Sequence, residues 1–283
     1  MTPVFLADNG SLRPEAFLNL RRVAGLLAER LGMEITPVSI LHSDRIPSAA
    51  LGGVGAVTLE TALRAHARQG QAKAIVLPYF IGPSGALTWY LQERLVQMQS
   101  EGLPMTVTVA PFLSPGTELD DGMLAQIVAE RVQETIIAKG LVRPPVVVVD
   151  HGSPAAAVTA VREVVAQQVA VLLGEQVATV QTASMERRPG DEFAFNEPLL
   201  ERKLTQPGFD SGDVVVALLF LSPGRHAGPD GDVARICLTL QKHQPSLHTH
   251  MTGLVGTHPS VVAMLANRWQ QLKSGHGHSY TGK

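Results

Sequence analysis

The sequence is poor in cysteine and aromatic residues, and it has no block of basic residues. One cysteine, Cys237, stands among 283 residues. A single cysteine excludes an intrachain disulfide, a four-cysteine zinc site and a self-contained iron–sulfur cluster. Lys and Arg number 23 against 25 Asp and Glu, which gives a formal net charge of −2. The charge pattern of nucleic-acid-binding proteins is therefore missing, and we expect no nucleic-acid partner.

Long hydrophobic runs are missing as well. No apolar run approaches the roughly 18–20 residues needed to cross a bilayer, so we expect no membrane partner. The start, MTPVFLADNGSLRPEAF, lacks the basic and apolar segments of a signal peptide. With the single cysteine, this predicts a cytoplasmic protein. Hydrophobic residues at 45% and charged residues at 17% are typical of a globular chain, and the length suits two domains.

Strand and helix patterns alternate along the chain, and the series runs twice. Apolar runs predict buried strands at 4–7, 35–41, 72–80, 105–113, 146–149, 177–184, 214–221 and 249–255. Apolar residues spaced by three or four predict helices at 14–31, 57–67, 88–99, 121–139, 158–173, 198–205, 232–242 and 259–273. This order predicts an α/β fold of two tandem domains, each with a four-stranded parallel sheet flanked by helices.

The two halves of the chain also align residue by residue. VVVVDHGSP in the second half aligns with VFLADNGSL in the first, and FLSP aligns with FIGP. The segment 143–145, Arg-Pro-Pro, reads as a linker because paired prolines stiffen the chain and cannot extend a helix. We therefore expect domains at 1–142 and 143–283.

Two histidines directly follow predicted strands of the second half. His151 lies in DHGS after the strand at 146–149, and His226 lies in SPGRHAG after the strand at 214–221. The aligned positions of the first half hold Asn and Ala. Ligands of open α/β sheets bind at the carboxyl ends of the strands. Neutral imidazole is the commonest protein ligand of divalent transition metals, so this pattern predicts a metal site.

Two glutamates compete for the place of a third ligand. Glu186 follows the strand at 177–184 almost directly, and so it lies at the same predicted edge. Glu197 precedes a proline at a predicted helix start, where the helix dipole favours a carboxylate without any metal. Between them, the polar segment 187–192 reads as an insert that lengthens the loop beside the site. Spacing alone does not choose between the two glutamates.

The second half resembles the CbiX/SirB-like class II chelatases in their long two-domain form. The resemblance is carried by DHGS, by ASME with NEPLLE, by LFLSPGRHAG and by the closing GLVGTHPSVVAMLANRW, and the first half matches as a degenerate copy. It implies the chelatase-like fold. It also implies insertion of Co²⁺ or Fe²⁺ into sirohydrochlorin, an acidic tetrapyrrole of the sirohaem and cobalamin pathways, without any nucleotide. A non-catalytic metal or tetrapyrrole carrier is the alternative.

The resemblance also implies residue roles. Its two metal-binding histidines match His151 and His226, and its glutamate matches Glu186 best. These three are therefore the expected catalytic residues and metal ligands. Glu197, which matches the acidic residue before the following proline, is a fourth candidate ligand.

Further residues are candidates for contact with the substrate. Ser153 and Gly228 are small, which would let a flat ligand approach closely. Arg225 and Arg187 could pair with carboxylates at the tetrapyrrole edge. The Arg-His order at 225–226 also faintly matches a phosphoryl-transfer loop, a hypothesis we rank well behind. We expect the histidine-bearing tail 275–278 to be disordered, and the sequence leaves homodimer formation open.

Overall fold

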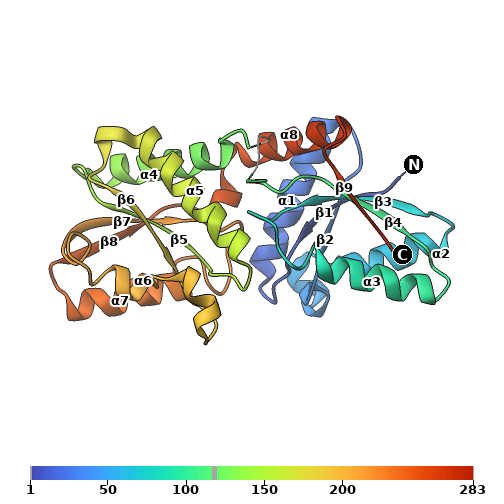
Figure 1. Ribbon diagram of the computed structural model, residues 1–283, viewed down its shortest axis with the longest axis horizontal. Coiled ribbons are helices and arrows are strands. Elements are labelled where there is room, and N and C mark those ends of the chain that lie inside the picture. The colour runs from blue at the N-terminus through green and yellow to red at the C-terminus, as the bar shows by residue number, and fades with distance from the viewer. Residues whose placement is uncertain (1, 117–119, 283) are drawn as a thin grey trace. The chain divides into compact units, whose positions relative to one another are not determined.

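The computed structural model describes residues 2–116 and 120–282, and the chain divides into two compact α/β units (Figure 1). Unit 1 comprises Met1–Leu119 and Pro259–Lys283, and unit 2 comprises Asp120–His258. Each unit has a twisted sheet with helices on both faces. The predicted α/β fold is confirmed.

Unit 2 is built on four parallel strands in the order β6-β5-β7-β8. These are β5 (Val146–Asp150), β6 (Val180–Ser184), β7 (Gly212–Leu218) and β8 (Leu247–Met251). Helices α4 (Met123–Lys139) and α5 (Ala156–Leu173) cover one face, and α6 (Leu200–Lys203) and α7 (Asp232–His243) cover the other (Figure 1). Short 3₁₀ helices lie at Gly174–Gln176, Asp191–Asn196 and Val255–Thr257.

The central strands of unit 2 are apolar on both faces. All five residues of β5 are buried, as are the last five of β7. Runs of β-branched residues favour a strand because they pack well on a pleated surface, and such runs suit a parallel sheet covered by helices. Polar residues therefore begin where these strands end, at the carboxyl rim of the sheet.

Unit 1 has a mixed five-stranded sheet in the order β2-β1-β3-β4-β9. Its parallel strands are β1 (Val4–Asp8), β2 (Thr36–Ser39), β3 (Lys73–Pro78) and β4 (Thr106–Val109). Helices α1 (Pro14–Leu31) and α8 (Val261–Lys273) lie together on one face, and α2 (Leu59–Arg68) and α3 (Trp89–Ser100) complete the unit (Figure 1). The 3₁₀ helices of this unit are Ser43–Arg45 and Ser48–Leu51.

The fifth strand of unit 1 corrects two expectations. The C-terminal segment was expected to be disordered, but His278–Thr281 forms β9, antiparallel to β4. The side chain of Gln92 also donates a hydrogen bond to the Thr281 carbonyl at 2.6 Å. A strand added at the edge satisfies the free backbone groups of β4, which is why a short polar tail becomes ordered. The sheet is therefore not the four-stranded parallel sheet expected for this half.

The compact units do not follow the expected boundary at residues 142 and 143. Helix α4 follows the strands of the first half but packs on α5 and β7 in unit 2. Helix α8 follows the strands of the second half but packs on α1 and β3 in unit 1. Each sequence repeat thus contributes its last helix to the other unit. The chain passes between the units near residues 119 and 258, away from the proline pair.

One described segment, Ala156–Gln176, is long and apolar enough to cross a membrane by length and composition. It consists of α5 and the short helix that follows. Helix α5 packs against β5, β6 and α4 within unit 2. Packed core helices of folded domains meet the same criterion, so this segment is weak evidence for a membrane span.

Asp8 is a buried carboxylate at the end of β1. Its side chain is 8% exposed, and its Oδ1 atom has no hydrogen-bond partner among the described residues. The corresponding residue of unit 2, Asp150, forms an ion pair with Arg162 at 3.1 Å. In unit 1 the position that aligns with Arg162 is Leu20 in α1, so Asp8 has no such partner. Burial without a neighbouring cation raises the pKa of Asp8 to about 6.

We predict that Asp8→Asn stabilises the protein at neutral pH more than at acid pH. The folded-state pKa of Asp8 is about 6 and the ordinary value is 3.8, so the wild type loses stability as the pH rises from about 4 to 6. The loss is on the order of 3 kcal/mol, and an asparagine does not undergo it. Urea unfolding at pH 4.5 and pH 7.5 measures the difference. Equal effects at both pH values would contradict the prediction.

Candidate functional site

The two histidines singled out in the sequence meet at the carboxyl rim of the unit 2 sheet. His151 directly follows β5, and His226 lies in the loop between β7 and α7. Because β5 and β7 are adjacent parallel strands, both loops leave the sheet at the same edge. The imidazole rings lie edge to face, with centroids 4.5 Å apart and an interplanar angle of 75°. The expected convergence of the two rings is therefore present.

Glu186 is brought to His151 by the backbone beyond the end of β6. The amide of Met185 donates to the Asp150 carbonyl at 2.8 Å, and the amide of Glu186 donates to the His151 carbonyl at 3.1 Å. The pairing of β5 with β6 thus continues past the two strands. Oε1 of Glu186 lies 3.4 Å from Nε2 of His151.

Gly152 permits this close approach of the two loops. Its φ is +90°, which favours glycine, and a Cβ atom at this position would overlap the carbonyl oxygen of Glu186. Glycine in the DHGS motif is therefore required by the contact between the loops that carry His151 and Glu186.

Both imidazoles have Nδ1 beside an acceptor. Nδ1 of His151 is 2.9 Å from the Gly152 carbonyl oxygen, and Nδ1 of His226 is 2.6 Å from Oδ2 of Asp232. Carbonyl and carboxylate oxygens only accept, so Nδ1 is the donor in each pair. In the neutral rings the lone pair then lies on Nε2, the atom available to a metal ion.

The charge state of His226 favours this arrangement. Burial lowers the pKa of His226, and the neighbouring His151 lowers it further, against the opposing effect of Asp232 and Glu186. The ring is therefore neutral at neutral pH. Burial alone would raise the pKa of Asp232, but its bonds from Arg235 and His226 lower it overall.

The distance between His151 and Glu186 suits two ligands of one ion. Two donors bonded at about 2.1 Å to a tetrahedral metal lie roughly 3.4 Å apart, and Nε2 and Oε1 are 3.4 Å apart. Among the residues that the structure describes, however, no group of three or more His, Cys, Asp or Glu is already arranged to hold a metal. An ion bound by His151 and Glu186 would therefore gain His226 as a third ligand only after a shift of its side chain.

Glu197 and Arg187 form a separate ion pair. Nε of Arg187 donates to Oε1 of Glu197 at 2.8 Å, and Oε2 of Glu197 accepts from the Leu199 amide at 3.0 Å. Glu197 forms no ion pair with either histidine in the described part of the chain. Of the two glutamates that the sequence left open, the structure therefore brings Glu186 to the histidines and leaves Glu197 at the start of α6.

The other predicted substrate contacts lie in the loops around the histidines. The Ser153 hydroxyl accepts from the Ala155 amide at 3.0 Å and turns the chain toward α5. Arg225 is 73% exposed, with Nε 3.7 Å from Oδ2 of Asp232. Gly228 has a φ of +140° and open space where a Cβ atom would lie.

A cavity of about 400 Å³ adjoins the site. Two residues already described, Glu186 and Asp232, lie in its wall. The remainder of the lining comes from Met185, Glu201, Arg235, Ile236, Thr239 and Leu240. The lining therefore combines apolar side chains, two of them from α7, with three carboxylates and one arginine.

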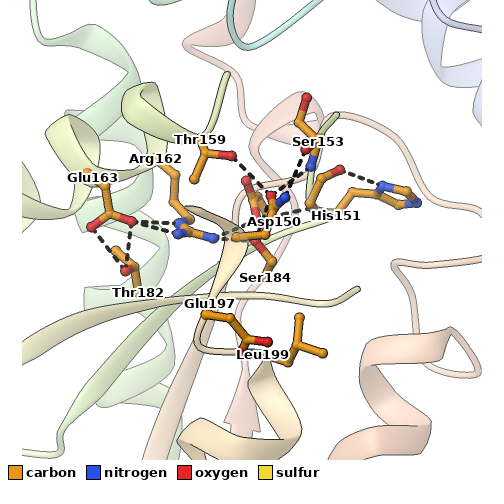
Figure 2. Close-up of polar contacts among 12 residues, drawn as sticks. Asp150, His151, Ser153, Thr159, Arg162, Glu163, Thr182, Ser184, Glu197 and Leu199 are labelled. Carbon is orange, nitrogen blue, oxygen red and sulfur yellow. Dashed lines mark hydrogen bonds and ion pairs between the residues drawn. The ribbon is translucent and has the colours of Figure 1, made fainter. Parts of the chain in front are cut away.

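A buried polar network that sequence analysis missed supports the loop of His151. Figure 2 shows the Arg162 side chain between Glu163 and Thr182 on one side and Asp150 and Ser184 on the other. Arg162 is only 1% exposed, and a buried charge needs compensation. Asp150 at 3.1 Å and Glu163 at 2.7 Å provide it. Asp150 in turn accepts from the Gly152 amide at 3.1 Å.

Asn196 fixes the next turn of the same loop. Its fully buried amide accepts from the Ser153 amide and donates to the Ser153 carbonyl, both at 2.9 Å. It also donates to Phe193 at 3.2 Å. An arginine on an apolar helix and an asparagine beside two phenylalanines are the sequence signals that could have indicated this network.

The first half lacks the histidines and the glutamate of the site, but it has the same backbone contacts between the two loops. The Leu41 amide donates to the Asn9 carbonyl at 3.1 Å, as Glu186 does to His151, and Gly10 lies against Leu41 as Gly152 does against Glu186. Leu41 is thus the structural counterpart of Glu186 in the first half.

The polar segment beside Glu186 is not an insert relative to the first half. Bridges from Ser39 to Thr58 and from Ser184 to Leu199 mark equivalent points of the two repeats. The first half has residues 40–57 between these points, and the second half has the shorter segment 185–198. Relative to the first half, the loop beside Glu186 is therefore not lengthened, and the comparison with the family pattern stays a prediction.

The fold and the site together define a class, a two-unit α/β protein with a histidine–glutamate cluster at the rim of one parallel sheet. Residues 145–272 match the CbiX family model. The match to this family is confined to that part of the chain, while the whole chain has the fold of the solved two-domain SirB and CbiX chelatases. No curated protein matches the chain by sequence.

Solved chelatase structures match the chain over nearly its whole length. SirB from Bacillus subtilis with Fe³⁺ is 16% identical, with a TM-score of 0.66, and the match covers 96% of this chain and 95% of SirB. The sirohydrochlorin chelatase SirB from Bacillus subtilis subspecies spizizenii in complex with cobalt is 16% identical, with a TM-score of 0.61 and 97% of both chains covered. CbiX, the terminal enzyme of sirohaem biosynthesis in denitrifying bacteria, is 17% identical, with a TM-score of 0.55 and coverage of 95% and 98%.

We predict that Gly152→Ala both destabilises the protein and weakens Co²⁺ binding. The added Cβ must displace the Glu186 backbone, at an expected cost of about 2 kcal/mol or more. Gly10→Ala is the matched control, because it makes the same overlap with Leu41 in unit 1. It should destabilise similarly but leave Co²⁺ affinity unchanged. Urea unfolding and Co²⁺ titration test both variants, and wild-type Co²⁺ affinity in Gly152→Ala would contradict the prediction.

Proposed function

We propose that this protein is a chelatase that inserts Co²⁺ or Fe²⁺ into a sirohydrochlorin-type tetrapyrrole without a nucleotide. The observation that carries the proposal is the meeting of His151, His226 and Glu186 at one sheet rim. The match of residues 145–272 to the CbiX family model supports it, as do the structures of SirB with Fe³⁺ and with cobalt on the same fold. The cytoplasmic location and the question of a homodimer stay predictions from the sequence.

The ligand atoms suit an ion that must be released again. Imidazole Nε2 and a carboxylate oxygen bind divalent transition ions through few, exchangeable bonds. His151 is 45% exposed and Glu186 is 60% exposed at their side chains, so a macrocycle can approach the ion while they hold it. The pyrrole nitrogens then replace the protein ligands one by one.

The same atoms can take the protons that insertion releases. A dication that enters the macrocycle displaces two pyrrole N–H protons. As the ion leaves, the lone pairs of His151 Nε2 and Glu186 become free, and both groups are bases. The site therefore exchanges one dication for two protons at the same atoms, with no change in its total charge.

The cations near the site suit an acidic macrocycle. Arg225 and Arg235 are 73% and 63% exposed, and both contact Asp232. Their guanidinium groups can pair with peripheral carboxylates of the substrate. Ser153 and Gly228 stay in this proposal as small residues at the approach. Arg187 stays a weaker candidate, because its side chain is only 25% exposed and Glu197 and the Gly190 carbonyl engage its guanidinium.

We expect His151→Ala, His226→Ala and Glu186→Ala each to lower the insertion rate by at least about 100-fold, because each removes a ligand or base. The assay follows the absorbance of sirohydrochlorin supplied with Co²⁺, and with Fe²⁺ without oxygen. His248→Ala is the control, since His248 is exposed on β8. It should stay within about twofold of the wild type.

Glu197→Gln separates the two glutamates in the same assay. It should lower stability, because Arg187 loses its carboxylate partner, while the insertion rate per folded molecule stays near that of the wild type. If the wild type does not exceed the uncatalysed rate, the chelatase proposal fails. Stoichiometric binding of metal or tetrapyrrole without faster insertion would identify a carrier instead.

A further inference from the structure

Asp232, which the sequence analysis did not single out, lies directly behind the ring of His226. It is the first residue of α7, and its Oδ2 atom is 2.6 Å from Nδ1 of His226. The backbone closes the same loop, because the amide of Asp232 donates to the Arg225 carbonyl at 3.1 Å and the Val233 amide donates to the His226 carbonyl at 3.2 Å.

The passage of the chain next to His226 requires a small residue. A Cβ atom at Gly231 would lie 2.8 Å from the backbone carbonyl carbon and oxygen of His226. Glycine therefore lets the start of α7 lie directly against the histidine. The contact between Asp232 and His226 is thus fixed by the backbone on both sides and does not depend on a flexible loop.

Two arginines share the same carboxylate. Arg235 donates to Oδ1 of Asp232, and Nε of Arg225 lies 3.7 Å from Oδ2. A carboxylate held by two guanidinium groups is an acceptor only, so the proton of the His226–Asp232 bond belongs to the imidazole. The neighbouring His151 differs, because a neutral backbone carbonyl accepts from its Nδ1.

We propose that Asp232 is a positioning residue for His226. It holds the ring by its Nδ1–H group and so directs the Nε2 lone pair to the incoming ion. This inference rests on the proposed function, in which His226 handles the metal. A carboxylate behind a ligating imidazole fixes its tautomer and increases its basicity, so we expect His226 to be the stronger of the two histidine ligands.

The chain offers a matched control pair. Oδ1 of Asp213 lies 2.8 Å from Nε2 of His250. This pair links the start of β7 to β8, whereas the site follows the carboxyl ends of the strands. Asp213→Ala therefore removes a similar histidine–carboxylate contact in the same unit without touching the site.

The first experiment titrates the full-length protein with Co²⁺ in the absence of any tetrapyrrole. Asp232→Ala should bind Co²⁺ about 10- to 100-fold more weakly than the wild type. Asp232→Asn, whose amide oxygen can still accept from Nδ1, should lose less, and Asp213→Ala should match the wild type. Unchanged Co²⁺ affinity in a folded Asp232→Ala variant would overturn the proposal. If Asp232→Ala does not fold, the test uses Asp232→Asn. Wild-type Co²⁺ affinity in Asp232→Asn, combined with an altered tautomer of His226, would then overturn the proposal.

The second experiment reads the tautomer of His226 directly by long-range ¹H–¹⁵N correlation NMR, with the signal assigned by His226→Gln. The wild type should show the Nδ1–H form. Asp232→Ala should redistribute the proton toward Nε2, whereas Asp232→Asn should keep the Nδ1–H form. A merely structural role for Asp232 would leave the tautomer unchanged in Asp232→Ala, and that result would overturn the proposal.

Removing Asp232 also frees two positive charges near the ion. The double variant Asp232→Ala/Arg235→Ala separates this effect from positioning, and it should keep most of the affinity loss. Full recovery of Co²⁺ affinity in the double variant would assign the loss to charge and contradict the proposal. Because these readouts need no tetrapyrrole, a failure of metal insertion in the wild type would not alter their outcome.

Discussion

The site depends on one constraint, the continuation of β5–β6 pairing beyond the ends of the strands. Two backbone hydrogen bonds, from the amides of Met185 and Glu186, hold the loop of His151 against the loop of Glu186. Gly152 makes the contact possible, because any side chain there would overlap the Glu186 carbonyl. The neighbouring strand β7 then brings His226 to the same rim. Side chains from three segments distant in sequence are thereby placed by backbone geometry.

The first half keeps this backbone contact and has lost both the site and its support. The motif glycine and its close approach are retained at Gly10 and Leu41. In unit 2 the carboxylate at the strand end is balanced by buried Arg162, while in unit 1 Asp8 is left without that cation. A buried charge pair holds its loop in one geometry, because separating it would leave an uncompensated charge. Unit 1 thus lacks, at one strand end, both the buried arginine and the histidine that unit 2 has.

The sequence was sufficient for the α/β class, for the positions of all eight parallel strands and for the rim that holds the histidines, because these follow from apolar periodicity. It could not choose between Glu186 and Glu197, since that choice depends on Arg187, which pairs with one of them. The exchange of α4 and α8 between the units could also not be predicted, because the apolar face of a helix does not indicate which sheet the helix packs on. Asp232 and β9 were missed for a related reason. Their partners, His226 and β4, are defined only by the folded chain.

Charge balance connects the rim to the proposed reaction. Glu186 and Asp232 are negative, Arg225 and Arg235 flank Asp232, and the pKa of His226 is lowered by burial and by its neighbour His151. A neutral His226 ring binds a dication without first having to lose a proton. When the ion passes to the macrocycle, the two displaced pyrrole protons restore the same charge at the same ligand atoms. Because both Nδ1 atoms already donate to acceptors, the proposed exchange would take place at the Nε2 atoms and the Glu186 carboxylate.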